Sequence, residues 1–257
     1  MNYNNYNYLD LFHGIGGFAL GAYWAGMKFK KHFCSDVEPY IVGLYAKRFP
    51  ESIQLGDITK IDWEKLKSEN PGKWIITGGF PCQDISCAGK GDGIYEGKRS
   101  SLWFAYRDAI SILRPKFAIV ENVGAITFRG LDAVLGSLAE IGYNAEWQDI
   151  RAEDVGAPHK RERIWIVAYP TIEGLERKKS KRVRPEKSGL FAKCGWWESE
   201  PAVGRVANGV SEGLDGFDRY QGKLSDKSFN RKDRLKGLGN AIVPMIAKEL
   251  FNAIKNM

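Results

Sequence analysis

The sequence predicts an α/β fold in which helices cover both faces of a mostly parallel sheet. Short apolar runs alternate with helical stretches through the first two-thirds of the 257 residues, an order typical of such sheets. The hydrophobic content of 44% is enough for a sizeable core in one large domain, with or without a small attachment. The alternation stops near Tyr169, which marks the expected end of that domain.

Apolar runs of strand length, bounded by Gly, Pro or polar residues, predict the strands. Five strands are expected, at Tyr8–Phe12, Phe29–Ser35, Trp74–Thr77, Phe117–Val120 and Arg163–Ala168. Helices are expected between them, at Gly17–Trp24, Tyr40–Phe49, Ser101–Leu113 and Leu131–Ile141. A last helix is expected at Met245–Ile254, because Pro244 suits a first helical turn. One apolar face of it should pack back on the sheet, formed by Ile242, Ile246, Leu250 and Ile254.

The chain divides into three parts by composition. A first domain is expected over residues 1–170, a small irregular region over 171–236 and a C-terminal helical segment over 237–257. The middle part is rich in Gly, Ser, Lys and Arg, lacks sustained periodicity and holds a basic run at Arg177–Arg184. Such a run is usually a solvated linker, and the alternative is a segment that contacts phosphates.

Charge and cysteine content bear on the partners and the compartment. The net charge of +7 suits a polyanionic partner, although many proteins of this charge bind no nucleic acid. The four cysteines form no C-x-x-C pair, which argues against a structural zinc site and favours free thiols in a reducing compartment. No apolar run reaches the ~20 residues of a membrane helix, and no signal peptide is recognisable. We therefore expect a soluble, cytoplasmic protein without a metal.

Cys82 is the most informative residue of the chain. It follows the expected strand Trp74–Thr77 and the sequence GGFP, in which Pro81 has a fixed φ and the glycines permit close backbone approach. The cysteine therefore lies at the carboxyl end of a strand, where open α/β sheets bind their ligands. A buried inert thiol is the commoner role of a free cysteine. The polar, Gly-rich loop favours a nucleophile instead.

A second Gly-rich turn follows the first expected strand. Gly14, Gly16 and Ala19 match the G-x-G-x-x-A pattern of dinucleotide-binding turns. Asp36 and Glu38 follow about 20 residues later, at the end of the next strand, where a ribose hydroxyl needs an acceptor. The order favours an adenosine-containing cofactor over a plain Gly-rich turn. NAD, FAD and S-adenosylmethionine all fit this spacing.

Two further groups of polar residues accompany strands. Glu121 closes the strand Phe117–Val120 and is either a turn acid or a general acid beside Cys82. In a strand with a period of two, the residues that share one face would be His159, Arg161, Arg163 and Trp165. The two arginines are either surface salt-bridge formers or a pair that grips a phosphate or a base edge.

Taken in order, these segments closely resemble the cytosine-C5 DNA methyltransferase family. Five motifs carry the resemblance: D-L-F-x-G-x-G-G at Asp10–Gly17, G-F-P-C-Q at Gly79–Gln83, E-N-V at Glu121–Val123, R-x-R at Arg161–Arg163 and G-N-A at Gly239–Ala241. It covers Leu9 to about Tyr169 and Gly237 to about Ile246, and the compact layout is similar to prokaryotic and phage members. The implied fold is a Rossmann-like S-adenosylmethionine-dependent methyltransferase sheet, with residues 171–236 as a small irregular target-recognition region.

The resemblance implies methyl transfer from S-adenosylmethionine to C5 of a cytosine flipped out of duplex DNA, as in restriction-modification and phage methylation. The thiolate of Cys82 would add to C6, and Glu121 would hold and protonate N3. Arg161 or Arg163 would favour the thiolate or bind the cytosine O2. The expected partner is double-stranded DNA, and we expect a monomer.

The resemblance also assigns the cofactor pocket and shows three departures. The implied pocket residues are Phe12, Ile15, Gly16, Gly17, Asp36, Val37, Asp57, Ile58, Pro81, Leu102, Asn240 and Ala241. His159 stands where a glutamine is usual, and His13 stands where a small residue is usual and would crowd or contact the cofactor. The recognition region is short, so the target sequence cannot be read from it.

Three other functions are considered beside this one. A non-catalytic DNA-binding relative would have no need of Cys82, Glu121 and both arginines. RNA cytosine methylation fits the same chemistry, because the base arrives flipped in either case. A nicotinamide oxidoreductase would explain the Gly-rich turn but would leave Cys82 and Glu121 without a role.

Overall fold

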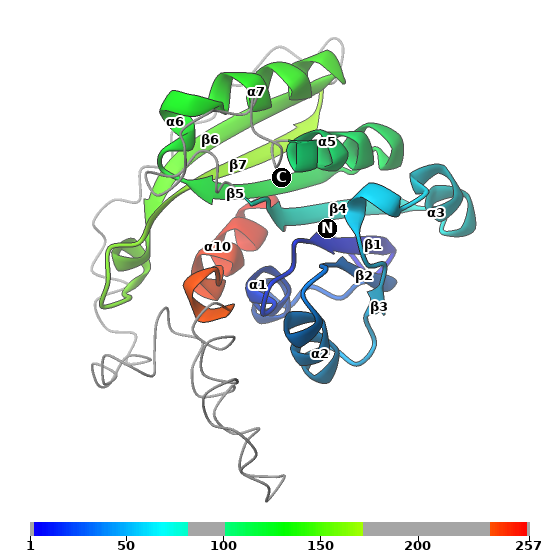
Figure 1. Cartoon of the computed structure of the whole chain (residues 1–257), viewed down its shortest axis with the longest axis horizontal. Helices are drawn as coiled ribbons and strands as arrows, with labels where there is room; N and C mark the ends of the chain where they lie inside the picture. The colour runs from blue at the N-terminus through cyan, green and yellow to red at the C-terminus, as the bar shows by residue number, and fades with distance from the viewer. Residues whose placement is uncertain (1–2, 82–100, 172–236, 256–257) are drawn as a thin grey trace, which may run out of the picture.

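The computed structural model describes residues 3–81, 101–171 and 237–255 (Figure 1). These residues form a seven-stranded sheet in the order β3-β2-β1-β4-β5-β7-β6. The strands are β1 (Tyr6–Leu11), β2 (Lys31–Ser35), β3 (Ile53–Gln54), β4 (Lys73–Gly79), β5 (Phe117–Val123), β6 (Tyr143–Arg151) and β7 (Glu162–Pro170). Strands β1 to β5 run parallel, whereas β7 runs antiparallel to both β5 and β6.

Helices cover both faces of the sheet, as the alternation in the sequence predicted. They are α1 (Gly17–Trp24), α2 (Pro39–Arg48), α3 (Trp63–Glu69), α5 (Ser101–Leu113), α6 (Ile126–Arg129), α7 (Leu131–Glu140) and α10 (Pro244–Lys255), with the 3₁₀ turns η1 (Ile58–Lys60) and η2 (Ala152–Val155). The bounds predicted for α1 and α5 are confirmed, and those of α2 and α7 differ by a single residue at one or both ends.

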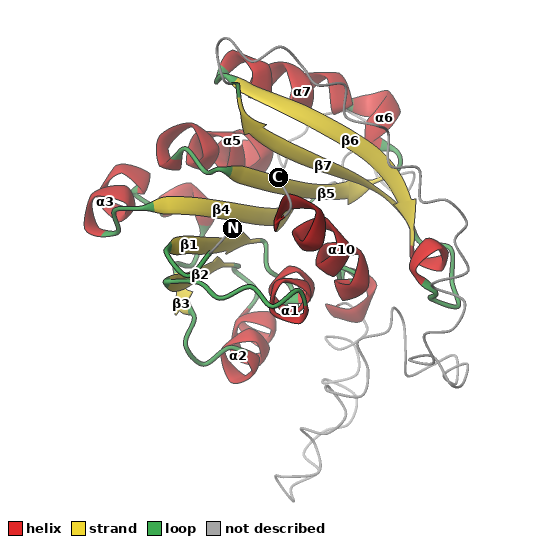
Figure 2. Ribbon diagram, turned by 180° about the vertical axis from the view of Figure 1, so that it is seen from behind, coloured by secondary structure: helices red, strands yellow, loops and turns green. Residues whose placement is uncertain are grey.

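The central strands contribute alternate residues to two separate cores. Leu9 and Leu11 of β1 pack with α3, α5 and α7 on one face. Tyr6 and Tyr8 of the same strand face the opposite core, where α1, α2 and α10 lie. Figure 2 shows α10 next to α1 on this second face. The C-terminal helix therefore packs back on the sheet, through Ile246 and other buried side chains.

The sheet is mostly parallel, as predicted, but one strand pairs in the opposite direction with both of its neighbours. The strand predicted at Arg163–Ala168 is present as β7, but it runs against its neighbour β5. The strand β6 was not predicted, because its middle residues are exposed and polar and give no apolar run. As a result of the reversal, the start of β7 lies at the same edge of the sheet as the carboxyl ends of β1, β4 and β5.

Two helical glycines differ in the space around them. A Cβ added at Gly21 in α1 would lie 2.6 Å from both the Cβ of Ala247 and the carbonyl O of Pro244. Gly21 therefore lets α1 and α10 approach closely. Gly43 in α2 is exposed and has no atom within 4 Å of such a Cβ.

We expect opposite effects from the same substitution at these two glycines. Gly43→Ala should raise the free energy of unfolding by about 0.5–1 kcal/mol, because alanine lowers the entropy of the unfolded chain and favours the helix. Gly21→Ala should lower it by about 1–3 kcal/mol, because the methyl group forces α1 and α10 apart. Urea unfolding of the two variants and the wild type measures both changes, and equal effects would contradict this packing.

A buried acid lies beneath the Gly-rich turn. Asp10 of β1 is fully buried and accepts hydrogen bonds from the hydroxyls of Thr77 and Tyr45, each at 2.9 Å. The Tyr8 hydroxyl contacts the Thr77 hydroxyl at 2.8 Å. His32 Nε2 contacts the Tyr45 hydroxyl at 2.8 Å. Burial raises the pKa of Asp10 to about 7, although the two hydroxyl bonds act in the opposite direction. The network joins β1, β2, β4 and α2.

This raised pKa predicts how stability varies with pH. Between about pH 4 and pH 7 the folded protein holds a proton on Asp10 that the unfolded chain has released. The contribution of this group to stability is therefore complete below that range and is lost as the pH rises through about 7. Replacing the acid by asparagine (Asp10→Asn) should make the fall in unfolding free energy across this range shallower. If the unfolding free energy of variant and wild type changed with pH in the same way, the raised pKa of Asp10 would be refuted.

Candidate active site

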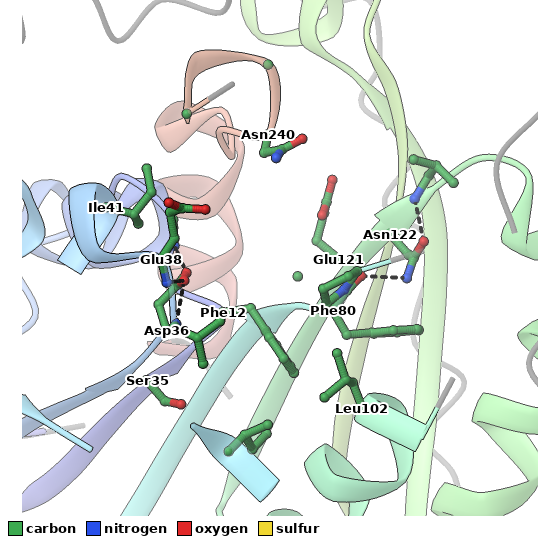
Figure 3. A pocket seen from close by; sticks show the side chains of 18 of the residues that line it. Phe12, Ser35, Asp36, Glu38, Ile41, Phe80, Leu102, Glu121, Asn122 and Asn240 are labelled. Atoms are coloured by element: carbon green, nitrogen blue, oxygen red, sulfur yellow. Dashed lines mark hydrogen bonds between the residues drawn. The ribbon is translucent and has the colours of Figure 1, made fainter. Parts of the chain in front are cut away.

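A cavity of about 700 Å³ opens at the carboxyl edge of the parallel strands. Acidic side chains lie on two sides of it, Asp36 and Glu38 on one and Glu121 on the other, with Phe12 between them (Figure 3). The strand order changes direction between β1 and β4, and open α/β sheets bind ligands at such a point. The cavity therefore lies where the sequence predicted a ligand site.

The structure brings eight of the twelve predicted pocket residues to this cavity. They are Phe12, Asp36, Val37, Asp57, Ile58, Pro81, Leu102 and Asn240. Ile15 and Ala241 do not line it and pack instead in a small apolar cluster with Ile41 and Leu238.

Gly16 and Gly17, which were also predicted to line the pocket, serve the packing of α1. A Cβ at Gly16 would lie 2.5 Å from the ring of Phe49, and a Cβ at Gly17 would lie 2.5 Å from the carbonyl O of Ile242. Both glycines permit close approach, but their neighbours are parts of this chain. The spacing of glycines in a sequence does not distinguish a ligand from a packed segment.

The backbone turns sharply where β1 ends. Phe12 has a φ of 50° and Gly14 a φ of 52°, both in the left-handed region. That conformation is uncommon for phenylalanine, and such strain is concentrated at functional sites. The turn places the Phe12 side chain in the cavity wall.

Asp36 holds the two loops on its side of the cavity together. One carboxylate oxygen accepts the N–H of Gly14 at 3.1 Å, and the other accepts the N–H groups of Val37 and Glu38 at 2.8 and 3.0 Å. These bonds leave Glu38 at the cavity wall as a second acid. Its position was noted in the sequence, but the resemblance assigned no role to it.

Asp57 and Ile58 reach the cavity through the turn η1. Asp57 precedes this turn and accepts hydrogen bonds from the N–H and the hydroxyl of Thr59 at 3.0 and 2.8 Å. These bonds lower the pKa of Asp57, so it is ionised at neutral pH. Val37, with 67% of its surface exposed, adds an apolar surface to the same wall.

Glu121 is the buried acid of the opposite wall. Its carboxylate lies 3.0 Å from Nε of Arg163, and 9% of the residue is exposed. Burial raises the pKa of Glu121, whereas the positive charges of Arg163 and Arg161 act in the opposite direction. A Cβ at Gly79 would lie 2.7 Å from Oε2 of this carboxylate, so the glycine leaves the space that the acid occupies.

Asn122 connects the acid to the loop that leads to Cys82. Its side-chain amide donates to the carbonyl O of Phe80 at 3.3 Å, and its side-chain oxygen accepts the N–H of Val123 at 2.8 Å. Phe80 is buried and Pro81 lines the cavity. Cys82 itself lies outside the described residues, as does the basic run Arg177–Arg184.

The two arginines of the R-x-R motif have different partners. Arg163 pairs with Glu121, whereas Arg161 donates to the carbonyl oxygens of Gly239 and Ala241 at 2.9 and 2.7 Å. The strand β7 begins only at Glu162, and Arg161 has a φ of 28°. The period-two rule therefore does not extend from Arg163 back to Arg161, and no local pattern in the sequence indicates this separation.

The two histidines that depart from the family pattern lie in different surroundings. His13 is buried, packs against Tyr45 with ring centroids 3.9 Å apart and the ring planes tilted by 40°, and contacts Gln54 at 2.9 Å. It does not line the cavity. Both ring nitrogens of His159 are buried without a hydrogen-bond partner among the described residues. Burial and the nearby charge of Arg161 lower its pKa, so His159 is neutral at neutral pH.

In residues 3–81, 101–171 and 237–255, no three His, Cys, Asp or Glu side chains come together as metal ligands would. None of the helices in the same ranges combines the length and apolar character of a membrane-spanning segment.

Comparison with known proteins identifies the family. Residues 6–205 match the C-5 cytosine-specific DNA methylases. The Type II methyltransferase M.NgoBI of Neisseria gonorrhoeae is 36% identical over 173 residues, which are 64% of this chain and 50% of that protein. The orphan methyltransferase M.Rho11sI of Bacillus phage rho11s is 30% identical over 165 residues, covering 62% of this chain and 32% of that protein.

A solved structure supports the fold. The Entamoeba histolytica methyltransferase EhMeth has a TM-score of 0.54 at 23% identity, over 67% of this chain and 55% of that one. The chain spans half or less of the length of the two curated relatives. The family match nevertheless covers most of the chain and includes Asp36, Glu121 and Arg163. The protein therefore belongs to the family of C-5 cytosine-specific DNA methylases.

Proposed function

We propose that this protein is a DNA (cytosine-5-)-methyltransferase. It transfers a methyl group from S-adenosylmethionine to C5 of a cytosine flipped out of duplex DNA, through a covalent adduct of Cys82 with C6. One observation carries the proposal: a buried carboxyl group of raised pKa, Glu121, faces the same cavity as the acids Asp36 and Glu38. A site for a base and a site for an adenosine group thus adjoin.

The chemistry of the cavity wall fits S-adenosylmethionine. Glu38, with Asp36 beside it, would hold the ribose hydroxyls, and Asp57 would accept from the adenine amine. Val37 and Ile58 offer apolar surfaces to the adenine ring. Further residues assigned to this pocket are Phe12, Pro81, Leu102 and Asn240. When bound, the cofactor supplies an activated methyl group.

Glu121 would act on N3 of the cytosine. Because burial raises its pKa, the carboxyl group keeps a proton to a higher pH than an exposed glutamate does, and it can donate that proton. Arg163, 3.0 Å from the carboxylate, limits this shift and presents a cation for the cytosine O2. The pair would stabilise the charge that develops on the ring during attack.

Cys82 would supply the nucleophile. Addition of its thiolate to C6 moves an electron pair towards C5 and makes that carbon nucleophilic, while N3 takes the proton from Glu121. C5 would then take the methyl group, and loss of the C5 hydrogen as a proton would expel the thiolate. N3 would give its proton back, and the ring would be restored. Asn122 supports this step indirectly, because it fixes the carbonyl of Phe80 two residues before the cysteine. The target base must leave the duplex, at a cost of about a few kcal/mol.

The adduct provides the direct test of this mechanism. We expect Cys82→Ala to abolish transfer of labelled methyl groups to mixed-sequence duplex DNA, because no other group attacks C6. Duplex DNA with 5-fluorocytosine at the target should trap a covalent complex with the wild type only, since fluorine cannot leave as a proton. Transfer at the parental rate by Cys82→Ala would disprove the mechanism.

The acceptor is tested in the same assay. Duplex DNA and transfer RNA are offered separately to the wild type, and we expect methylation of the DNA. Methylation of the RNA alone would replace the proposed substrate while leaving the chemistry of Cys82 intact. Binding of both without transfer to either would favour the non-catalytic relative.

Gly79 tests the role of the Glu121 carboxylate. Gly79→Ala places a methyl group 2.7 Å from Oε2 of Glu121, which is too close, so the acid must move away from its position beside Arg163. We expect kcat to fall by about tenfold to hundredfold, the usual cost of a displacement of this size at a reacting group. Gly124→Ala is the matched control, since its methyl group would lie an ordinary 3.5 Å from the nearest described atom. Equal activity of the two variants would contradict the placement of Glu121.

A further inference from the structure

Arg161 joins two parts of the chain that are far apart in the sequence. Its Nη1–H donates to the carbonyl O of Gly239 at 2.9 Å, and its Nη2–H donates to that of Ala241 at 2.7 Å. Asn240 lies between these two carbonyls and lines the cavity (Figure 3). Both terminal nitrogens of one guanidinium are therefore committed to the loop 239–241.

The backbone of Arg161 is itself held in an unfavourable conformation. Its φ of 28° lies in the left-handed region, which arginine rarely adopts. The N–H of Ala152 in η2 approaches the carbonyl oxygens of Lys160 and Arg161 at 2.8 and 3.3 Å. Backbone strain that the surrounding structure maintains is concentrated at functional sites, which indicates that the position of the Arg161 side chain is needed for the site.

Apolar contacts support the loop on its other side. Leu238 and Ala241 pack with Ile15 and Ile41, which belong to the first Gly-rich turn and to α2. These contacts tie the loop to the cofactor side of the cavity. Among the described residues, Arg161 provides the hydrogen bonds that tie it to the edge bearing Glu121 and Arg163.

We propose that Arg161 is a positioning residue for the cofactor, which fixes Asn240 at the cavity wall by holding the carbonyls of Gly239 and Ala241. The inference rests on the proposed function, because the cofactor is that of the proposed reaction. It differs from the role that the resemblance implied, contact with the thiolate or the cytosine O2. Arginine suits the task because its planar guanidinium donates two bonds in fixed directions, whereas lysine donates from a single nitrogen.

Hydrogen exchange tests the contact without any cofactor. In Arg161→Ala we expect amides of residues 237–243 to exchange about tenfold faster, the order expected for loss of a charge-assisted hydrogen bond. Arg161→Lys should give a smaller increase in the same peptides. Arg151→Ala is the matched control, because Arg151 is exposed, pairs with Glu153 and Glu162 and does not line the cavity. Unchanged exchange in 237–243, or equal acceleration throughout the protein in both Arg161 variants, would overturn the proposal.

Calorimetric titration with S-adenosylhomocysteine tests the consequence for binding. We expect Arg161→Ala to weaken binding by about tenfold, Arg161→Lys to restore part of it and Arg151→Ala to leave it unchanged. If Arg161 acts through the loop, its loss should cost less in an Asn240→Ala background, so the two effects should not add. Additive effects would contradict action through Asn240, and normal affinity with slow methyl transfer would place Arg161 at the base instead.

These two measurements separate the inference from the function on which it rests. If the wild type does not bind S-adenosylhomocysteine, the proposed function fails, and the exchange data still decide whether Arg161 holds the loop. If the wild type binds it and transfers methyl groups, but neither exchange nor affinity responds to Arg161→Ala, the inference fails alone.

Discussion

The buried carboxylate of Glu121 is the constraint around which the carboxyl edge of the sheet is organised. A charge in this position is costly unless a partner of opposite sign lies close to it. Arg163 supplies that partner at 3.0 Å, and Gly79 leaves room for the acid because it has no side chain. Three strands thus have to meet in one register, β4 and β5 parallel and β7 antiparallel. Burial therefore raises the pKa of Glu121, and the nearby arginines offset part of this rise.

The other wall of the cavity depends on backbone groups rather than on ion pairs. Asp36 accepts three backbone N–H groups and thereby joins the Gly-rich turn to the start of α2. The loop 239–241 closes the cavity from the C-terminal part of the chain, with apolar contacts on one side and Arg161 on the other. The site is therefore assembled from segments as far apart in the sequence as Phe12 and Asn240, and each is held by contacts outside its own segment.

The sequence predicted the residues of the site better than their roles. Asp36, Glu121 and Arg163 were expected together, and the structure places all three at the cavity. Gly16 matched a ligand-binding pattern and the resemblance added Gly17, but their nearest neighbours are Phe49 and Ile242. A glycine pattern reports that something lies close to the backbone, and both a ligand and a packed loop meet that condition.

Local patterns along the chain were sufficient to establish the order of strands and helices and the polar residues that follow each strand. Apolar periodicity and turn residues depend on near neighbours, so α1 and α5 were predicted with their observed bounds. The direction of β7 and the partners of Arg161 and Arg163 depend on pairings between distant segments, and no local pattern encodes them. The folded chain was needed to show that β7 starts at the cavity, that Arg163 meets Glu121 and that Arg161 turns to the C-terminal loop.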